Sequence, residues 1–406
     1  MSSTTKLLFC DLEITGHHVE YLYHLIKYRI ERPECPDFVL VTHPQFLEKL
    51  EAFNLPCGWQ GKGTSVIYPS LEQMRKLEAH QSVISKANDE FRIFYNCAVE
   101  NSPKYCYLMA LNKYQFVLGR GFARSFPCPI RGILFSPFSV MNGGRGFYEY
   151  FKSCFLRFRK HLQLLWMISN KKIDHIFVLN DLSLSQCLKN RYRRKGFFVA
   201  LPDPILIPPR HVWHFMADLS NNPKRRIRFL LFGSLSSRKG IFLVLDALRL
   251  LPAQIAKRIE MVFAGQVIAE DYTRFRSAVS NIQRDRPGIN ITFYDGFIPY
   301  EKIPAVFQSA DCVLVPYTLV GASSGIIGHS ALYEKPVIGP AKGLIGQLIR
   351  QYGLGMDIAP MDPSNIASAI IRFVKNGTSN IDKHGMQKFI KERQPSRFVA
   401  TLLGHE

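Results

Sequence analysis

The sequence predicts an α/β protein built from two doubly wound, mostly parallel sheets. Strand and helix patterns alternate along nearly the whole chain, which is typical of parallel sheets with crossover helices. Four prolines within residues 201–209 interrupt this alternation and permit neither a helix nor a central strand. The length of 406 residues also exceeds what one hydrophobic core usually serves. We therefore expect domains at residues 1–205 and 206–380, followed by a helix within 381–406.

In the first half, apolar runs bounded by turn residues predict strands, and amphipathic stretches between them predict helices. The expected strands are 6–10, 38–42, 65–69, 92–96, 130–135, 173–178 and 196–201. The expected helices include 17–28, 71–88 and 147–169.

The second half repeats the alternation more regularly. The expected strands are 228–232, 260–264, 290–294, 312–315, 336–338 and 356–358, and the expected helices are 241–251, 271–284, 300–308, 324–334, 344–351, 363–375 and 381–403. Ligands of such a sheet bind outside the carboxyl ends of its strands. We therefore look for function in the loops that follow these strands.

Composition narrows the class of protein. With 47% hydrophobic and 12% aromatic residues, the chain has ample material for a folded core. No apolar run reaches the roughly 18 residues needed for a spanning helix, so we expect a cytoplasmic or peripheral protein. The nine cysteines include no C-x-x-C pair, so we expect reduced thiols and no structural metal.

The net charge of +20 predicts an acidic partner: a phosphorylated ligand, an anionic membrane surface or, less in keeping with the rest of the chain, nucleic acid. The predicted helix 147–169 mixes aromatic residues with Lys and Arg, so it has the composition of a helix that lies on an anionic bilayer. An internal helix of a doubly wound domain has the same apolar stripe buried against its sheet, and this alternative stays open.

One polar loop stands out between the predicted strand 312–315 and the helix 324–334. Ser323, Ser324 and Gly325 lie where that helix exposes unpaired backbone N–H groups and the positive end of its dipole. Glycine lets a ligand approach the backbone, and serine hydroxyls bond phosphate oxygens. The loop therefore suits an anion, although an ordinary serine N-cap on a surface helix explains it as well.

Three further strand ends carry suitable residues. Gly233 follows the first strand of the second half and precedes Arg238 and Lys239 at another helix start, where two cations suit a diphosphate. Gly265 follows the second strand, and Phe297 and Ile298 follow the third, where glycine allows a flat ring to approach the backbone. Singly, each is also compatible with a routine turn.

Five motifs follow one another in the second half: Gly233-x5-Lys239-Gly240, Phe263-Ala264-Gly265, Gly296-Phe297-Ile298, residues 310–316 and Ala331-x4-Pro336-Val337-Ile338. In this order they resemble the family 4 glycosyltransferases of the GT-B fold. The resemblance covers about 226–373. It implies two Rossmann-like domains facing across a cleft, and retaining, hexosyltransferase-like transfer from a nucleotide-sugar donor on the second domain to an unidentified acceptor on the first. It also implies that the last helix returns to the first domain. The donor is a substrate, so no cofactor is expected, and the absence of a DxD-like carboxylate pair predicts a metal-independent enzyme.

The chain departs from this family at three positions. Ser234 stands where the family usually has an arginine, and Gly321 and His329 stand where it usually has two glutamates. The imidazole of His329 can still bond a nucleotide ribose. The missing glutamates leave a catalytically silent, nucleotide-sugar-binding or partner-binding GT-B protein as the alternative. Another GT-B enzyme, such as a sugar-nucleotide 2-epimerase, is less favoured because its signature carboxylates and histidines are not evident.

In the first domain, Gly16 leaves room for a diphosphate, and His17 or His18 is a candidate for orienting a sugar hydroxyl. Solvent-facing residues at a helix start are the alternative for both histidines. Asn96 is a candidate by its position alone. The expected catalytic residues are thus His17 and His18, and the expected donor-binding residues are Gly16, Gly233, Arg238, Lys239, Gly265, Phe297, Ile298, Ser323, Ser324, Gly325 and His329.

Overall fold

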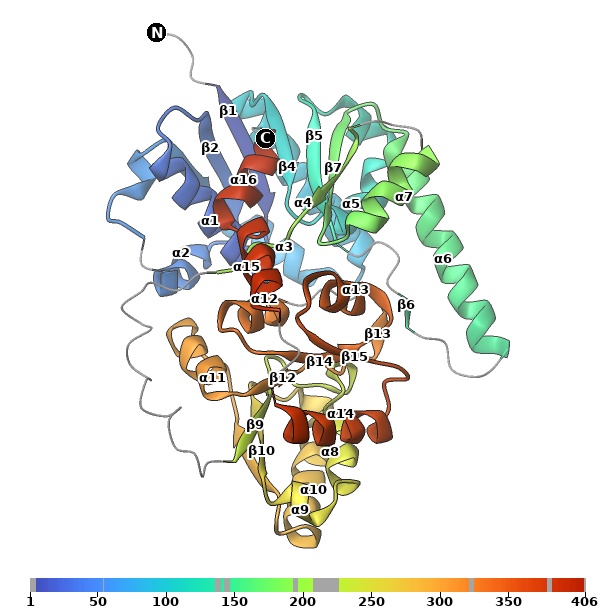
Figure 1. Ribbon diagram of the computed structural model, residues 1–406. Helices are drawn as coiled ribbons and strands as arrows, with labels where there is room; N and C mark the ends of the chain where they lie inside the picture. Colours follow the sequence, from blue (N-terminus) through green and yellow to red (C-terminus); the bar gives the residue numbers. More distant parts are fainter. Residues whose placement is uncertain are drawn as a thin grey trace. The chain divides into compact units, whose positions relative to one another are not determined.

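The computed structural model describes residues 5–53, 55–135, 140–141, 147–192, 196–206, 226–320, 325–377 and 382–404. The chain divides into two compact units (Figure 1). The first unit comprises Met1–Phe138, Arg145–Pro204 and Pro395–Glu406, and the second comprises Ser139–Gly144 and Ile205–Gln394. Each unit contains one parallel sheet with helices around it, so the prediction of two doubly wound α/β sheets is confirmed.

The sheet of the first unit has seven strands in the order β3-β2-β1-β4-β5-β7-β8. Every neighbouring pair is parallel. The strand order runs one way from β1 to β3 and the other way from β4 onward, which makes the gap between β1 and β4 the topological switch point. The strands are β1 Lys6–Asp11, β2 Asp37–Thr42, β3 Thr64–Ile67, β4 Tyr105–Leu108, β5 Ile130–Leu134, β7 Ile173–Leu179 and β8 Phe198–Leu201.

Helices cover both faces of this sheet. Successive residues of β1 enter different cores: Leu8 packs in a cluster with α3 to α6, while Leu7 and Phe9 pack with α1, α2 and α16. Burial on both faces explains why β1 is an almost continuous apolar run. The helices are α1 His17–Glu31, α2 Phe46–Leu50, α3 Leu71–Ala79, α4 Val83–Asn101, α5 Leu111–Leu118, α6 Phe147–Ile168, α7 Leu182–Tyr192 and α16 Pro395–Leu403.

Three predictions for the first unit are wrong. The residues 92–96 are not a strand but the middle of α4, whose buried Ala87, Phe91, Phe94 and Ala98 follow the helical period. Asn96 is exposed on this helix, so its predicted place at a strand end is also wrong. The predicted helix 71–88 ends at Ala79, and Ser82 then caps α4 by accepting a hydrogen bond from the Ser85 N–H group.

The second unit has a six-stranded sheet in the order β11-β10-β9-β12-β14-β15, again with parallel neighbours. Its switch point lies between β9 and β12. The strands are β9 Ile227–Phe232, β10 Ile259–Ala264, β11 Asn290–Tyr294, β12 Cys312–Leu314, β14 Val337–Pro340 and β15 Gly355–Ile358; β6 Val140–Met141 and β13 Leu319–Val320 form a separate antiparallel pair. The helices are α8 Ile241–Arg249, α9 Ala253–Ala256, α10 Ala269–Asp285, α11 Ile303–Ser309, α12 Gly325–Leu332, α13 Gly343–Tyr352, α14 Pro363–Asn376 and α15 Lys383–Glu392.

The end of the chain differs from the single helix predicted over 381–403. Two helices occur there: α15 belongs to the second unit, whereas α16 belongs to the first and packs against α1. The break falls before Pro395, because the residue that precedes a proline disfavours the helical conformation. The chain thus enters the first unit again at Pro395 rather than near residue 381.

The start of the proline-rich segment, residues 201–204, is held to the first unit by one buried carboxylate. Asp203 accepts a hydrogen bond of 2.5 Å from the Tyr21 hydroxyl and another of 3.3 Å from the Asn180 side-chain amide. Asp203 is only 5% exposed, so these bonds replace the water that the carboxylate loses. Burial and the Asp203 charge both raise the pKa of Tyr21, which keeps its hydroxyl protonated as the donor.

We predict that Tyr21→Phe lowers the stability of the first unit by about 1.5 to 3 kcal/mol, because a buried carboxylate loses a donor. Urea unfolding followed by circular dichroism measures this change. Tyr23→Phe, at a half-buried tyrosine of the same helix, is the matched control and should leave the transition nearly unchanged. Equal midpoints for Tyr21→Phe and the parent protein would show that the bond does not hold the segment.

Candidate functional site

The candidate site begins at the switch point of the second unit. The chain leaves β9 at Phe232 and β12 at Leu314, and these two strands are neighbours in the sheet. Because the connections on the two sides of a switch point run in opposite directions, a crevice forms outside the carboxyl ends of the strands. Gly233 follows β9 directly, and Lys239 lies in the short turn that leads into α8.

The ammonium group of Lys239 lies directly over Gly233. A Cβ atom at Gly233 would come within 2.6 Å of Lys239 Nζ, so a larger residue would displace the ammonium group. Gly233 also has φ +97°, a conformation that other residues rarely adopt. Lys239 Nζ donates a hydrogen bond of 3.4 Å to the Phe232 carbonyl oxygen. The glycine and the lysine are therefore a matched pair.

Lys239 is a buried cation. Only 9% of its surface is exposed, and within the described residues no carboxylate forms an ion pair with it. Burial, and then the positive charge of Arg238, lower its pKa to about 8. A protein gains nothing in stability from such a lysine. An anionic ligand beside Nζ would supply the missing negative charge.

Backbone contacts fix the turn that carries Lys239. Gly240 has φ +78°, and a Cβ atom there would lie 2.2 Å from the Pro316 carbonyl oxygen, so glycine allows the loops after β9 and β12 to touch. The N–H and hydroxyl groups of Thr318 both donate to the Arg238 carbonyl oxygen at 3.1 Å. The Arg238 side chain itself is exposed. On the other side, the Asp271 carboxylate accepts two bonds of 2.6 Å from Ser237.

The amino terminus of α12 reaches the same place. The Ile326 side chain in its first turn lies 3.7 Å from where a Gly233 Cβ atom would be. Gly325 begins the helix, so its free N–H groups and positive dipole end lie on the side of Lys239. Ser323 and Ser324, the predicted phosphate-binding serines, lie outside the described residues, as does Gly321.

The two glycines that follow β10 and β11, Gly265 and Gly296, differ in their packing. A Cβ atom at Gly265 would lie 2.0 Å from the Gly233 carbonyl oxygen. Because Gly265 has no Cβ atom, the segments that follow β9 and β10 can pack together. Beyond β11, a Cβ atom at Gly296 would meet nothing within 4 Å, and the Phe297 ring is 74% exposed. Ile298 is half-buried. An exposed aromatic ring at a strand end is free to stack on a flat ligand.

His329 lies one turn along α12, half-buried against an aromatic ring. Its imidazole centroid lies 5.4 Å from that of Phe307, which in turn packs 5.0 Å from Phe232 at the end of β9. This position is close to the strand end that carries Gly233. The predicted ribose contact of His329 stays a prediction.

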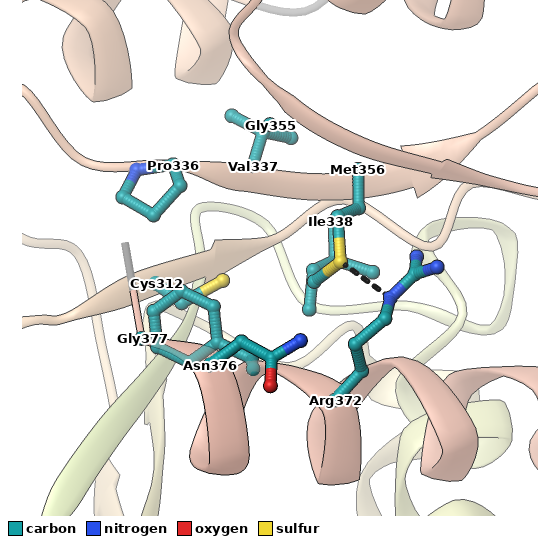
Figure 2. Close-up of a pocket in the computed structure, with 10 residues that line it drawn as sticks. Cys312, Pro336, Val337, Ile338, Gly355, Met356, Arg372, Asn376 and Gly377 are labelled. Atoms are coloured by element: carbon teal, nitrogen blue, oxygen red, sulfur yellow. Dashed lines mark hydrogen bonds between the residues drawn. The ribbon is translucent and has the colours of Figure 1, made fainter. Parts of the chain in front are cut away.

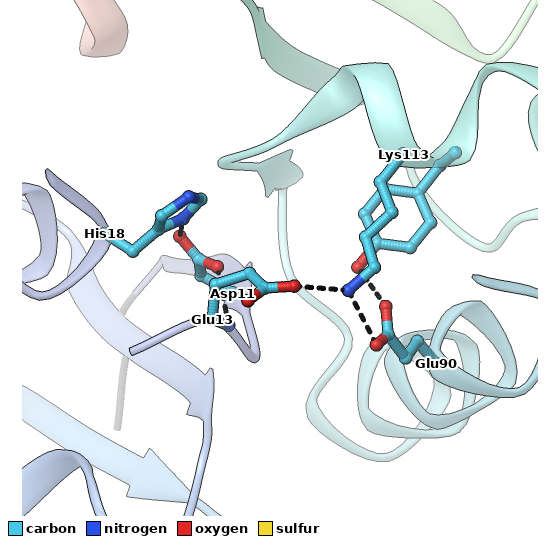
Figure 3. Close-up of polar contacts among 6 residues, drawn as sticks. Asp11, Glu13, His18, Glu90 and Lys113 are labelled. Atoms are coloured by element: carbon cyan, nitrogen blue, oxygen red, sulfur yellow. Dashed lines mark hydrogen bonds and ion pairs between the residues drawn. The ribbon is translucent and has the colours of Figure 1, made fainter. Parts of the chain in front are cut away.

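The first unit carries a polar cluster at its own switch point, shown in Figure 3. Asp11 ends β1, and its carboxylate bonds His18 Nδ1 at 2.8 Å in the first turn of α1. Burial disfavours the charged imidazole, but the hydrogen bond to Asp11 and its charge outweigh burial and raise the pKa of His18. The ring also stacks on Phe135 with centroids 6.1 Å apart. His18 is therefore held in one orientation by two contacts.

Lys113 completes this cluster. Its Nζ donates to Glu13 at 2.8 Å and to the buried Glu90 at 2.7 Å, and Glu90 also accepts a bond of 2.8 Å from the Tyr114 hydroxyl (Figure 3). Lys113 and Tyr114 lie on α5, which follows β4 across the switch point from β1. Sequence patterns did not predict these residues or Asp11, because α4 and α5 meet β1 only in the fold. The one local signal was an aspartate at a strand end, seven residues before His18.

The other candidate residues of the first unit, His17 and Gly16, do not join the polar cluster around His18. His17 is exposed on its helix and lies 3.5 Å from Glu20, and His24 contacts the same carboxylate from the other side at 3.4 Å. Burial would raise the pKa of Glu20, but these two histidines hold it at about 2. Gly16 precedes α1 with φ +60°, and a Cβ atom there would meet nothing within 4 Å, so its surroundings are open. His17 thus neighbours a structural carboxylate, whereas His18 belongs to the polar cluster.

The second unit also has a small cavity, which lies away from Lys239 (Figure 2). Its lining includes Cys312, Val337 and Gly355, the first residues of β12, β14 and β15, so it lies at the amino ends of these strands. Its volume of about 20 Å³ holds about one water molecule. It is too small for a substrate and lies at the edge of the sheet opposite Lys239.

Comparison with known proteins gives a partial match to one family model. Residues 216–393 match the family model of the glycosyl transferases group 1. This range includes Gly233, Lys239, Gly265 and α12, and it spans less than half of the chain. No curated protein matches the sequence.

Solved structures resemble the whole chain. HepE of Anabaena in complex with UDP and glucose has a TM-score of 0.64 at 16% identity, covering 99% of this chain and 100% of HepE. WaaG, a glycosyltransferase involved in lipopolysaccharide biosynthesis, gives 0.63 at 12% identity, with 98% and 100% covered. Sucrose-phosphate synthase from Thermosynechococcus elongatus gives 0.66 at 14% identity, with 99% and 98% covered. The predicted GT-B fold class, with its two Rossmann-like sheets, is confirmed.

The described residues offer neither a metal cluster nor a membrane span. No group of three or more His, Cys, Asp or Glu side chains there is arranged to hold a metal ion. No helix in the described part of the chain is both long and apolar enough to cross a membrane.

We predict that Lys239→Met weakens the binding of a nucleoside diphosphate by about 1.5 to 3 kcal/mol, the strength of a charged hydrogen bond, while the free protein becomes no less stable. The reason is that the variant removes an unneutralised buried cation. Calorimetric titration with UDP and a thermal unfolding scan give the two readings. Lys335→Met is the control, because Lys335 Nζ also donates to a backbone carbonyl, that of Gln308. Unchanged affinity in Lys239→Met would remove this lysine from the site.

Proposed function

We propose that the protein is a retaining glycosyltransferase of the family 4 type, which transfers a sugar from a nucleotide-sugar bound by the second unit to a hydroxylated acceptor. The observation that carries this proposal is the buried cation Lys239 over Gly233, at the switch point of the unit that matches the glycosyl transferases group 1. The HepE structure contains UDP and, in a second form, UDP-glucose. These ligands of a similarly folded protein make UDP-glucose the first donor to test.

The chemistry needs stabilisation of a leaving diphosphate. When the acceptor oxygen bonds to the anomeric carbon, the bond from that carbon to the diphosphate oxygen breaks and negative charge develops on the diphosphate. The acceptor hydroxyl gives up its proton in the same step, and the leaving diphosphate oxygen can accept it. Lys239 and the N–H groups at the start of α12 are fixed positive groups in a partly buried place, so they stabilise this charge without rearranging. Arg238, from its exposed position, adds charge at longer range. We propose on this basis that transfer needs no metal ion or cofactor.

The loops after β10 and β11 suit the nucleoside. Gly265 keeps the chain flat against Gly233, while the exposed Phe297 ring is available to stack on a base and Ile298 to flank it. His329, which is connected to the end of β9 through the Phe307 ring, is the group we assign to the ribose. Ser323 and Ser324 complete the proposed phosphate-binding loop before Gly325.

In the first unit we assign His18 rather than His17 to a hydroxyl of the sugar substrates. Asp11 binds His18 Nδ1, which leaves Nε2 as the nitrogen that can contact a ligand. Gly16 beside it keeps the approach open, because a Cβ atom there would meet nothing within 4 Å. The cluster around it contains the carboxylates of Asp11, Glu13 and Glu90 against one lysine. Because carboxylates outnumber lysines in this cluster, an acceptor without negative charge fits it best, such as a hydroxyl of a polysaccharide, glycolipid or small glycoside.

The alternative is a catalytically silent protein that binds a nucleotide-sugar or a partner. It is favoured by Gly321 and His329, which stand where the resembled family has glutamates. We also propose peripheral association with an anionic membrane surface on the cytoplasmic side, which is compatible with the net charge of +20.

We predict that the protein hydrolyses or transfers at least one nucleotide-sugar in a panel led by UDP-glucose, without added metal and in the presence of a chelator. Release of nucleoside diphosphate measures turnover, and Lys239→Met should reduce it more than about ten-fold. Donor binding without any turnover across the panel would favour the silent protein. Turnover that the chelator abolishes would contradict metal independence.

We also predict a pH-dependent contribution of His18 to stability. Because the folded protein raises the pKa of His18, the stabilisation is fully present below its unfolded pKa and is lost as pH rises through the folded value. His18→Gln should therefore lower the thermal unfolding temperature most at about pH 5.5 and least at about pH 8.5. His43→Gln, in the same unit but without a carboxylate partner among the described residues, is the control. A difference that grows with pH would contradict the Asp11–His18 pair.

A further inference from the structure

Over residues 158–168, whose side chains are described, α6 has one face packed into the first unit and another in solvent. On the packed side, Leu164, Met167 and Ile168 are buried in the core cluster with α4 and α5. His161 on the same side bonds the Tyr192 hydroxyl at 3.0 Å, which joins α6 to α7. Figure 1 shows α6 as a long helix at one edge of this unit, next to α7. One face of this helix is therefore buried in the core of the first unit.

The opposite face is apolar as well. Phe158, Leu162, Leu165 and Trp166 are 60%, 48%, 39% and 40% exposed. Their spacing of about four, three and one residues places them on one side of the helix as a continuous stripe. The core explanation for the apolar residues of this helix accounts for Leu164, Met167 and Ile168, and for the part of the Trp166 ring that packs against α5. It does not account for the exposed surface of Phe158, Leu162 and Leu165. Large apolar side chains gathered in this way mark an interaction surface.

The charge around the stripe is of one sign. No Asp or Glu occurs between Glu149 and Asp174, while this interval contains Lys152, Arg157, Arg159, Lys160, Lys171 and Lys172. Arg159 and Lys171 are exposed beside the stripe and at its end. Burial, and to a smaller extent the charge of Arg159, lower the pKa of Lys160.

A second basic group flanks Trp166. The Trp166 ring packs edge-on against Phe116 with centroids 5.1 Å apart, and the Arg120 guanidinium lies 4.9 Å from the Phe116 ring centroid. Arg120 is exposed. The apolar stripe is therefore bordered by exposed cations on α6 itself, at its carboxyl-terminal end and at the end of α5.

We propose that this face of α6 docks on an anionic lipid bilayer, with the stripe of Phe158, Leu162, Leu165 and Trp166 entering the boundary between headgroups and acyl chains. Arg120, Arg159 and Lys171 contact the anionic headgroups. An apolar stripe edged by the described cations Arg120, Arg159 and Lys171 is complementary to such a surface, whereas a second copy of the same face would bring like charges together. The proposal specifies the surface behind the peripheral association proposed above, and it does not depend on catalysis.

Co-sedimentation with vesicles tests it. The full-length protein should bind vesicles of phosphatidylcholine mixed with phosphatidylglycerol, bind pure phosphatidylcholine vesicles much less, and be released by salt. The double variant Phe158→Gln with Leu162→Gln should reduce partitioning about ten-fold or more, because it removes two apolar side chains from the boundary. Arg159→Gln should reduce binding to the anionic vesicles by about five-fold and leave binding to neutral ones unchanged.

The control is Leu71→Gln, at a leucine of the same unit that is 78% exposed on α3 and belongs to no such stripe. It should bind vesicles like the parent protein. Because all these side chains are exposed, the variants should keep the parent's thermal unfolding temperature and UDP affinity, both measured without vesicles. That reading separates a failure of docking from a failure of the proposed donor binding.

Tryptophan fluorescence gives an independent reading. The chain has three tryptophans, and replacing Trp59 and Trp213 with phenylalanine leaves Trp166 as the only one. Its emission should shift to shorter wavelength on anionic vesicles and be quenched by brominated acyl chains. An emission spectrum that does not change, or equal vesicle binding by the parent and the double variant, would overturn the proposal. The proposal would also be overturned if the parent protein bound no vesicles but formed a dimer, and the double variant were a monomer.

Discussion

The proposed donor site of the second unit depends on one close contact, the ammonium group of Lys239 above the bare backbone of Gly233. The contact needs a glycine with positive φ after β9, a turn held by Thr318 and Asp271, and a second glycine, Gly265, that lets the next strand end pack alongside. Each feature has a structural cost. Together they keep a lysine buried with a pKa of about 8 and without a described carboxylate partner, which makes sense if an anion binds there.

The two units treat charge differently at equivalent places in the fold. The second unit presents Lys239 and the positive end of α12 at its switch point, and the first presents Asp11, Glu13 and Glu90 around Lys113 and His18. A diphosphate donor suits the former, and a hydroxylated group without charge suits the latter. The excess positive charge of the chain is thus not gathered in the first-unit cluster, and part of it lies around α6.

Sequence patterns predicted the fold well where the signal was local. The strands of the second unit were placed to within about two residues, because buried parallel strands are short apolar runs with turn residues at their ends. The same rule failed at 92–96, where five residues of α4 imitate a strand and the helical period of Phe91 and Phe94 becomes clear only over a longer window. β4 was missed between two helices. Lys239 was predictable from its place after a strand, whereas the Asp11–His18 pair and its neighbours depend on contacts between distant elements.

The central claim is that Lys239 binds the diphosphate of the donor. With a pKa of about 8, the lysine is partly neutral at pH 8 in the free protein and should become fully charged when a diphosphate binds. Titration calorimetry with UDP-glucose at pH 8, in buffers of different ionisation enthalpy, measures the protons taken up on binding. A lysine with a pKa of about 8 should take up about half a proton at that pH, and much less at about pH 6.5. The uptake should disappear in Lys239→Met. Tight binding with no proton uptake at pH 8, or uptake that persists in the variant, would contradict the account.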